Sequence, residues 1–267
     1  MDEIKVLDHG YVKYVEHMGS DEVIIESARM STGRGFEGWE KDSKLLDFLY
    51  RHKHMSPFEM CELSIEVQAP LFVVREWHRH RTQSYNELSA RYTKMPDIHY
   101  VPTADRLAPK ETSNKQESSE GSGHNVENIP ELIVGEQNAI YGFYEDMLTA
   151  GVPREVARLN TPVSRYTRFR AKTDLRNWLG FLNLRMRENA QWEIRQYANA
   201  VSSIVKEHFP RTYALFEEYD LNGVSFSASE MAALRKSISA NSQVAVDAAM
   251  SLPEKRSGEF LSKLFGK

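Results

Sequence analysis

The chain has 267 residues and a formal net charge of −4, with 41% hydrophobic and 27% charged residues, which is typical of a globular protein of one large or two small domains. The negative charge argues against bulk nucleic-acid binding, and no apolar run approaches the roughly 20 residues that a membrane-spanning helix needs. The single cysteine, Cys61, cannot form an internal disulfide, so we expect a soluble cytoplasmic protein with no membrane or nucleic-acid partner.

Apolar residues recur along the chain with the two periods that distinguish strands from helices. Period-two alternation predicts short strands at residues 4–8, 11–18 and 62–67. Helical spacing predicts helices at about 21–33, 40–52, 69–74, 130–150, 173–188, 191–208, 228–239 and 256–265. A few short strands among many longer helices favour an α+β fold.

Composition divides the chain into three parts. Residues 103–129 are rich in Ser, Glu, Asn and Lys and contain almost no large apolar groups, so we expect a flexible surface insertion. The insertion interrupts a predicted main domain at residues 1–220, and a helical C-terminal extension is predicted at 221–267.

A glycine pattern at residues 33–38 has the form G-x-G-x-x-G, which is typical of dinucleotide-binding folds when it connects a strand to a helix. Here it follows a predicted helix, so we expect a flexible loop. We therefore expect no Rossmann-type cofactor site in this segment.

The predicted helix at 173–188 carries polar groups on its apolar side. Arg185 projects at the edge of an apolar stripe, beside Trp178, and Asn189 falls within the stripe. A cation and an amide on a core-facing surface are costly unless they are partnered. Arg185 is therefore either a member of a structural salt bridge or faces an anionic ligand in a pocket under the helix.

The densest group of hydrogen-bonding residues is residues 79–91, with the sequence RHRTQSYNELSAR, directly after the apolar run that ends at Val74. Arginine forks match phosphate oxygens in pairs, and guanidinium planes stack on flat rings. The stretch contains no lysine, and Trp77 and Tyr85 lie just before and within it, unlike an ordinary solvated basic surface. We interpret it as a binding site for a phosphorylated heteroaromatic ligand.

Histidine and cysteine residues suggest two further sites that we disfavour. The pairs His52/His54 and His78/His80 have metal-site spacing, but arginine and lysine neighbours raise the cost of binding a cation. We therefore predict no metal. Cys61 lies beside a carboxylate and lacks the cation that would lower a thiol pKa, so we interpret it as structural.

The motif R-H-R-x-x-S-x-N-E-x-S-x-R at residues 79–91 resembles the signature of the flavin-dependent thymidylate synthases, and every specified position is filled. Further segments that resemble the family lie at 54–59, 151–158, 181–185 and 190–194. The resemblance spans roughly residues 4 to 218, interrupted by the one insertion.

The resemblance implies a fold, a reaction and an assembly. The fold is α+β, with a small, mostly antiparallel sheet flanked by long helices. The reaction is the methylation of dUMP to dTMP, with methylenetetrahydrofolate as the carbon donor and FAD, reduced by NADPH, as the hydride source. The assembly is a homotetramer whose active sites are shared between subunits.

The resemblance also assigns residues to the two ligands. Positions that match the family's FAD contacts are His54, Ser56, Arg79, His80, Arg81, Glu87, Asp174, Arg176 and Asn189. Positions that match its dUMP contacts are Glu76, Arg79, Glu87, Leu88, Ser89, Ala90, Arg91, Arg158 and Arg185. Arg185 matches the catalytic guanidinium that stabilises the deprotonated N3 of uracil and so makes C5 nucleophilic.

The chain departs from the family pattern at three of the flavin positions. Asn189 stands where many members have a flavin-stacking histidine, and Asp174 and Gly180 stand where some have asparagines. Arg176, between the last two, still matches.

Two other hypotheses remain open from the sequence. The arginine-rich stretch could serve a nucleotide-binding or RNA-binding module without catalysis. A different flavin-dependent enzyme on the same scaffold could modify a neighbouring pyrimidine substrate.

Overall fold

A computed structural model describes residues 3–107 and 128–237, and near the C-terminus residues 247, 249–250, 252 and 254–265. Over these residues the chain divides into two units, Met1–Leu221 and Asn222–Lys267. The predicted insertion lies mostly at residues 108–127, outside the described part of the chain, and its expected flexibility stays a prediction.

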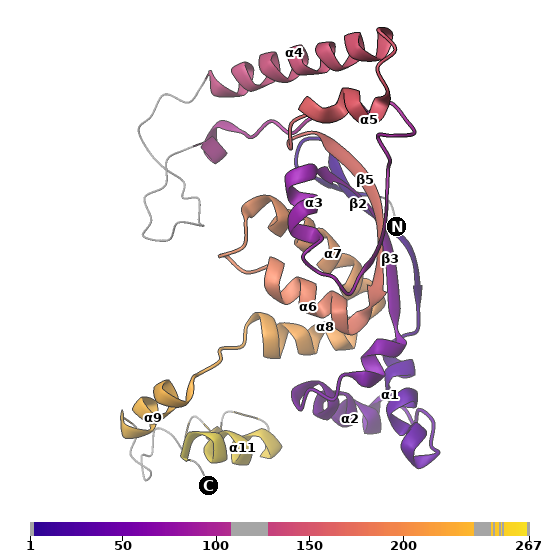
Figure 1. Ribbon diagram of the computed structural model, residues 1–267. Coiled ribbons are helices and arrows are strands. Elements are labelled where there is room, and N and C mark those ends of the chain that lie inside the picture. Colours follow the sequence, from indigo (N-terminus) through magenta and orange to yellow (C-terminus); the bar gives the residue numbers. More distant parts are fainter. Residues whose placement is uncertain are drawn as a thin grey trace. The chain divides into compact units, whose positions relative to one another are not determined.

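Five strands of the first unit form one sheet in the order β1-β2-β3-β5-β4, and every neighbouring pair is antiparallel (Figure 1). The strands are β1 Ile4–Val6, β2 Gly10–Met18, β3 Glu62–Pro70, β4 Ser84–Glu87 and β5 Tyr166–Asp174. The expected α+β fold with a small antiparallel sheet is confirmed.

Each face of the sheet follows from alternation along its central strands. On β3, Leu63, Ile65 and Val67 are fully buried, whereas the residues between them lie on the opposite face. On β5, Phe169 and Ala171 are buried and their neighbours are exposed cations. One face therefore belongs to the core, and the other carries charge.

Three helices of the first unit, α3, α6 and α7, pack on the sheet. The helices of this unit are α1 Asp21–Arg29, α2 Trp39–Arg51, α3 Leu71–Trp77, α4 Ile129–Thr149, α5 Arg154–Ala157, α6 Leu175–Arg185, α7 Trp192–His208 and α8 Pro210–Phe216. Short single-turn elements are η1 Met30–Thr32, η2 Ser56–Met60, η3 Ala104–Leu107, η4 Arg158–Asn160 and the π-turn η5 Glu217–Leu221. The second unit contains α9 Ala228–Ser237 and α11 Glu254–Phe265.

An aromatic cluster joins α3, α6 and α7 to the sheet, and Figure 1 shows these helices on one side of the strands. Trp77 of α3 lies 4.6 Å from Phe181 of α6 between ring centroids, and Trp178 donates its indole N–H to the Leu63 carbonyl at 3.0 Å. All three aromatic side chains have no exposed surface. This packing fixes the ends of α3 and α6, where several predicted site residues lie.

The helix predicted at 173–188 has different bounds in the structure, and two strands were not predicted. The helix predicted at 173–188 begins at Leu175 because the Asp174 carboxylate accepts the Asn177 backbone N–H at 2.8 Å and caps it. The same helix ends at Arg185. Neither β4 nor β5 was predicted, although residues 166–174 alternate apolar and polar side chains.

The glycine-rich loop at 33–38 lies between η1 and α2 and does not follow a strand, so it lacks the context of a dinucleotide-binding site. Gly33 and Gly38 have φ of 66° and 98°, a region that favours glycine. Arg29 holds the loop in place: it donates a hydrogen bond to the Gly35 carbonyl at 3.2 Å and forms an ion pair with Glu37 at 2.6 Å.

Candidate active site

The first part of the motif forms a tight turn between α3 and β4. Trp77 donates its indole N–H to the Gln83 side-chain oxygen at 3.0 Å inside the core. The Tyr85 hydroxyl donates to the carbonyls of Trp77 at 3.2 Å and His80 at 2.9 Å. These bonds are local in sequence, so the turn that presents His80 is defined by the motif itself.

Arg185, at the end of α6, lies beside two other predicted site residues. Its Nη1 lies 3.2 Å from the Glu76 carboxylate, and its Nη2 donates to the Glu76 carbonyl at 3.2 Å. Its Nε donates to His80 Nε2 at 3.0 Å. The salt bridge that was one of the two alternatives for Arg185 is therefore present. It joins Arg185 to Glu76, and the family resemblance assigns both residues to the substrate.

The His80 imidazole is neutral at physiological pH in this setting. Burial, followed by the positive charge of Arg185, lowers the pKa of His80 to about 4. A neutral imidazole that accepts at Nε2 carries its proton on Nδ1.

A cavity of about 300 Å³ brings together a second group of predicted substrate residues, namely Glu87, Leu88, Ala90 and Arg158. The Glu87 carboxylate accepts the hydroxyl of Thr167 at 2.7 Å. Leu71 and Arg75 of α3 also line this cavity, and Glu76 directly follows Arg75 on the same helix. The helix therefore connects the cavity to the Arg185 cluster.

Ser89 and Arg91 do not line that cavity. The Arg91 backbone N–H donates to the Ser89 hydroxyl at 3.3 Å, and Arg91 Nε lies 3.1 Å from the Glu155 carboxylate. More than half of each charged side chain is exposed, so the Arg91–Glu155 pair is weak. Arg91 remains able to exchange this partner for a phosphate.

The predicted flavin residues fall into two places. His54 and Ser56 are exposed at the start of η2, and Arg176 of α6 pairs with Glu59 of the same turn. Arg79 and Arg81 are exposed in the motif turn, and no carboxylate within residues 3–107 and 128–237 pairs with either.

Two other residues assigned to the flavin, Asp174 and Asn189, lie at the start of α6 and beyond its end. The Asp174 carboxylate is engaged as the cap of α6 and also accepts the Asn177 side-chain amide at 2.6 Å. Asn189 is exposed and follows the last helical residue by four positions, so its predicted place in the apolar stripe is wrong. The stripe itself is present, with Leu175, Leu179 and Leu182 buried.

Cys61 is fully buried, and its thiol lies 3.5 Å from the Ser20 carbonyl. Burial raises the pKa of Cys61 to about 11, so the side chain is a thiol at neutral pH. In the described part of the chain, no group of three or more histidine, cysteine and carboxylate side chains could hold a metal ion. Nor is any described helix long and apolar enough to cross a bilayer.

Sequence reasoning missed Thr167 and Arg75. Thr167 was missed because β5 was missed, and the alternation at 166–174 was the signal that could have found it. Arg75 is an exposed residue on a short helix, and no sequence motif or periodicity marks it as a site residue.

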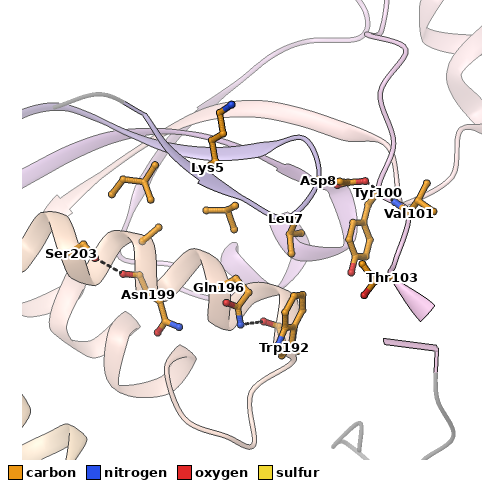
Figure 2. Close-up of a pocket in the computed structure, with 13 residues that line it drawn as sticks. Lys5, Leu7, Asp8, Tyr100, Val101, Thr103, Trp192, Gln196, Asn199 and Ser203 are labelled. Atoms are coloured by element: carbon orange, nitrogen blue, oxygen red, sulfur yellow. Dashed lines mark hydrogen bonds between the residues drawn. The ribbon is translucent and has the colours of Figure 1, made fainter. Parts of the chain in front are cut away.

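A larger cavity of about 590 Å³ lies elsewhere, between β1, the segment at 100–103 and α7. Figure 2 shows Trp192, Gln196, Asn199 and Ser203 of α7 along one side of it and Leu7 and Asp8 on the other. None of the predicted site residues lines it, so we place the chemistry at the motif.

The chain is similar to known proteins over most of its length. Residues 13–211 match the family model described as thymidylate synthase complementing protein. A flavin-dependent thymidylate synthase of Thermus thermophilus is 43% identical over 263 residues, covering 98% of this chain and 96% of the relative. One of Ehrlichia ruminantium is 41% identical over 241 residues, covering 88% of this chain and 80% of the relative.

The fold of the chain is also similar to that of solved structures. The UMP/dUMP methylase PolB of Streptomyces cacaoi, bound with 5-Br UMP, superposes with a TM-score of 0.73 at 30% identity. The match covers 81% of this chain and 97% of that structure. With its complete motif, its antiparallel sheet and these full-length relatives, the chain belongs to the flavin-dependent thymidylate synthase family.

Proposed function

We propose that the chain catalyses the reductive methylation of dUMP to dTMP, with methylenetetrahydrofolate as the carbon donor and NADPH as the reductant. Family membership supports dUMP as the substrate and FAD as the cofactor. The observation that carries the proposal is the Arg185 cluster, in which three hydrogen bonds hold one guanidinium beside the motif turn. A cation fixed in advance stabilises developing negative charge without reorganising during the reaction.

On the substrate side, Arg185 stabilises negative charge at N3 of the uracil ring and so raises the nucleophilicity of C5. Arg158 and Glu87 bind the nucleotide in the cavity that they line with Leu88 and Ala90. Ser89 and Arg91 bind the phosphate, because Arg91 gives up only an exposed ion pair with Glu155. No enzyme nucleophile takes part, in agreement with the buried thiol of Cys61.

The residues assigned to FAD fit that cofactor chemically. Arg79 and Arg81 are exposed cations without a carboxylate partner in residues 3–107 and 128–237, a donor set that suits a pyrophosphate and an electron-rich ring. His54, Ser56 and Arg176 would hold it from the η2 side. When bound, FAD supplies the hydride that converts the transferred one-carbon unit to a methyl group.

We further propose that the active enzyme is a homotetramer with shared sites. Arg176 and Arg185 are nine residues apart on α6, which at about 1.5 Å per residue separates them by about 14 Å along the helix. The flavin residues around η2 and the Arg185 cluster thus lie at opposite ends of one helix. This separation supports a site that a second chain completes.

The test is to purify the chain, measure flavin absorbance, and follow dTMP formation from dUMP, methylenetetrahydrofolate and NADPH by mass spectrometry. We expect a yellow protein whose NADPH oxidation is faster with dUMP. A colourless protein that binds no added FAD at micromolar concentration contradicts the proposal. UMP is the second candidate substrate, because the similar solved structure is titled a UMP/dUMP methylase, and a parallel reaction with UMP distinguishes the two.

A further inference from the structure

The His80 side chain is held between the catalytic arginine and the aromatic core. Its Nε2 accepts the Arg185 Nε–H at 3.0 Å. Its ring meets Phe181 at 4.8 Å between centroids with an interplanar angle of 69°, an edge-to-face contact. The imidazole therefore has one edge on Arg185 and packs against α6.

The backbone of His80 is fixed independently of its side chain. Its N–H donates to the Trp77 carbonyl at 3.0 Å, and its carbonyl accepts the Tyr85 hydroxyl at 2.9 Å. Burial raises the pKa of Tyr85 to about 12, so this hydroxyl keeps its proton at neutral pH. A residue whose backbone N–H and carbonyl are both hydrogen-bonded can hold a neighbouring side chain in a defined orientation.

The protonation state of His80 makes it an acceptor. Burial keeps its pKa near 4, so Nε2 is unprotonated at neutral pH and can receive the Arg185 donor. A charged imidazole at this position would instead repel the guanidinium.

Arg185 uses three of its five N–H donors in contacts with Glu76 and His80. The Nε donor goes to His80, and the two donors left over lie on Nη1 and Nη2. Those two nitrogens form the pair that binds a planar anion in a fork. The bond at Nε therefore sets the plane in which the fork lies.

We propose that His80 is a positioning residue for Arg185, and that its Nε2 atom holds the guanidinium plane in the orientation that binds the uracil ring. This role differs from the flavin contact that the family resemblance implies for His80. The inference rests on the proposed dUMP site.

Two amide variants separate this role from simple packing. His80→Gln places an amide oxygen near the position of Nε2, whereas the shorter His80→Asn reaches only the position of Nδ1. His80→Leu removes the acceptor altogether. His78→Leu is the matched control, since His78 lies two residues away and its Nε2 has no partner in the described part of the chain.

We expect His80→Leu and His80→Asn to weaken dUMP binding and lower kcat/KM for dUMP by roughly ten- to a hundredfold, the range for a hydrogen bond to a charged group. His80→Gln should stay within a few fold of the wild type, and FAD content should be unchanged in all variants. His78→Leu should stay within about twofold.

A double-mutant cycle on dUMP affinity gives the decisive comparison. In an Arg185→Ala background, His80→Leu should change dUMP affinity by less than about twofold, because the group through which His80 acts is already absent. An equal loss in both backgrounds overturns the inference, as does a His80→Leu protein that loses FAD but binds dUMP normally.

The wild-type reaction separates failure of the inference from failure of the proposed function. A wild type that binds dUMP but forms no dTMP contradicts the reaction, while the cycle still measures the coupling of His80 to Arg185. A wild type that binds no dUMP contradicts both.

Discussion

Arg185 forms an ion pair with Glu76 before any ligand binds. Only about a fifth of its side chain is exposed, and Glu76 neutralises part of its charge. A largely buried cation of this kind would be costly alone, so its partners hold it ready for a ligand.

Replacing Arg185 with alanine should weaken dUMP binding and lower dTMP formation about a hundredfold or more, the usual effect of losing one charge-stabilising donor. FAD content and NADPH oxidation without dUMP should change little. Arg185→Lys should not restore full activity, since an ammonium lacks the planar fork. Steady-state kinetics and flavin absorbance measure these effects. Loss of FAD or of the assembly, with normal turnover of what remains, would make Arg185 purely structural.

Cys61 should prove chemically inert. Because it is fully buried with a pKa of about 11, the native protein should not react with a thiol reagent at pH 8. Cys61→Ala should keep most turnover and lose about 1 kcal/mol of unfolding free energy. Inactivity in a folded, FAD-loaded variant would contradict the structural role.

At the scale of elements, one buried carboxylate joins the two ends of the first unit. Asp21 opens α1 and accepts the backbone N–H groups of Arg211 at 2.8 Å and Thr212 at 3.1 Å, together with the Thr212 hydroxyl at 2.6 Å. It therefore caps α8, although nearly 200 residues separate the two helices.

Asp21→Ala should lower the free energy of unfolding by about 2–3 kcal/mol, because it leaves buried donors without an acceptor. Denaturant titration measures the change. Glu26→Ala on the exposed side of α1 is the control and should stay within about 0.5 kcal/mol of the wild type. Similar losses in the two variants would rule out the cap as the cause.

The junction of β2 and α7 should make stability depend on pH. The rings of His17 and His208 lie 4.2 Å apart, with Tyr14 stacked on His208 and Glu207 beside it. Burial and the neighbouring His17 lower the pKa of His208 below its unfolded value of about 6.5.

A lowered histidine pKa means that the unfolded chain binds a proton more readily than the folded one. The stability that depends on neutral His208 is therefore fully present above about pH 6.5. It declines as the pH falls from there towards the folded pKa of His208. The melting temperature of the wild type should drop between pH 7 and pH 5, and His208→Gln should show a smaller drop. An unchanged pH dependence in the variant would exclude this pair as its source.

At the scale of the whole molecule, the large buried core lies between Val6 and Phe216, all within the first unit. Asp220 closes that unit by pairing with Lys53 and accepting the Tyr50 hydroxyl. A chain that ends at Leu221 should therefore fold with nearly the melting temperature of the full chain and still bind FAD.

Circular dichroism and flavin absorbance test this truncation. A chain that ends at Phe209 is the control, because it also loses α8 and should unfold. Aggregation of the 221-residue chain under conditions where the full chain is soluble would show that residues 222–267 belong to the same folding unit.

The sequence predicted much of this molecule where its patterns were local. The N-terminal hairpin, the long helices and the residues of the motif follow from short-range spacing. The Arg185 cluster could be predicted only in part, because Glu76 and His80 meet it across 109 and 105 positions of the chain. The Asp21 cap and the Thr167–Glu87 bond also join distant positions, which no local period reveals.

The pairing of β4 with β5 has a consequence for the length of the motif. Tyr85 and Glu87 lie opposite Ala171 and Phe169 and share their face, whereas Asn86 lies opposite Arg170 on the charged face. One residue inserted into the turn before β4 would exchange these faces and move the Glu87 carboxylate away from Thr167. A single substitution in this stretch alters one side chain, whereas a change in its length would displace all its side chains together.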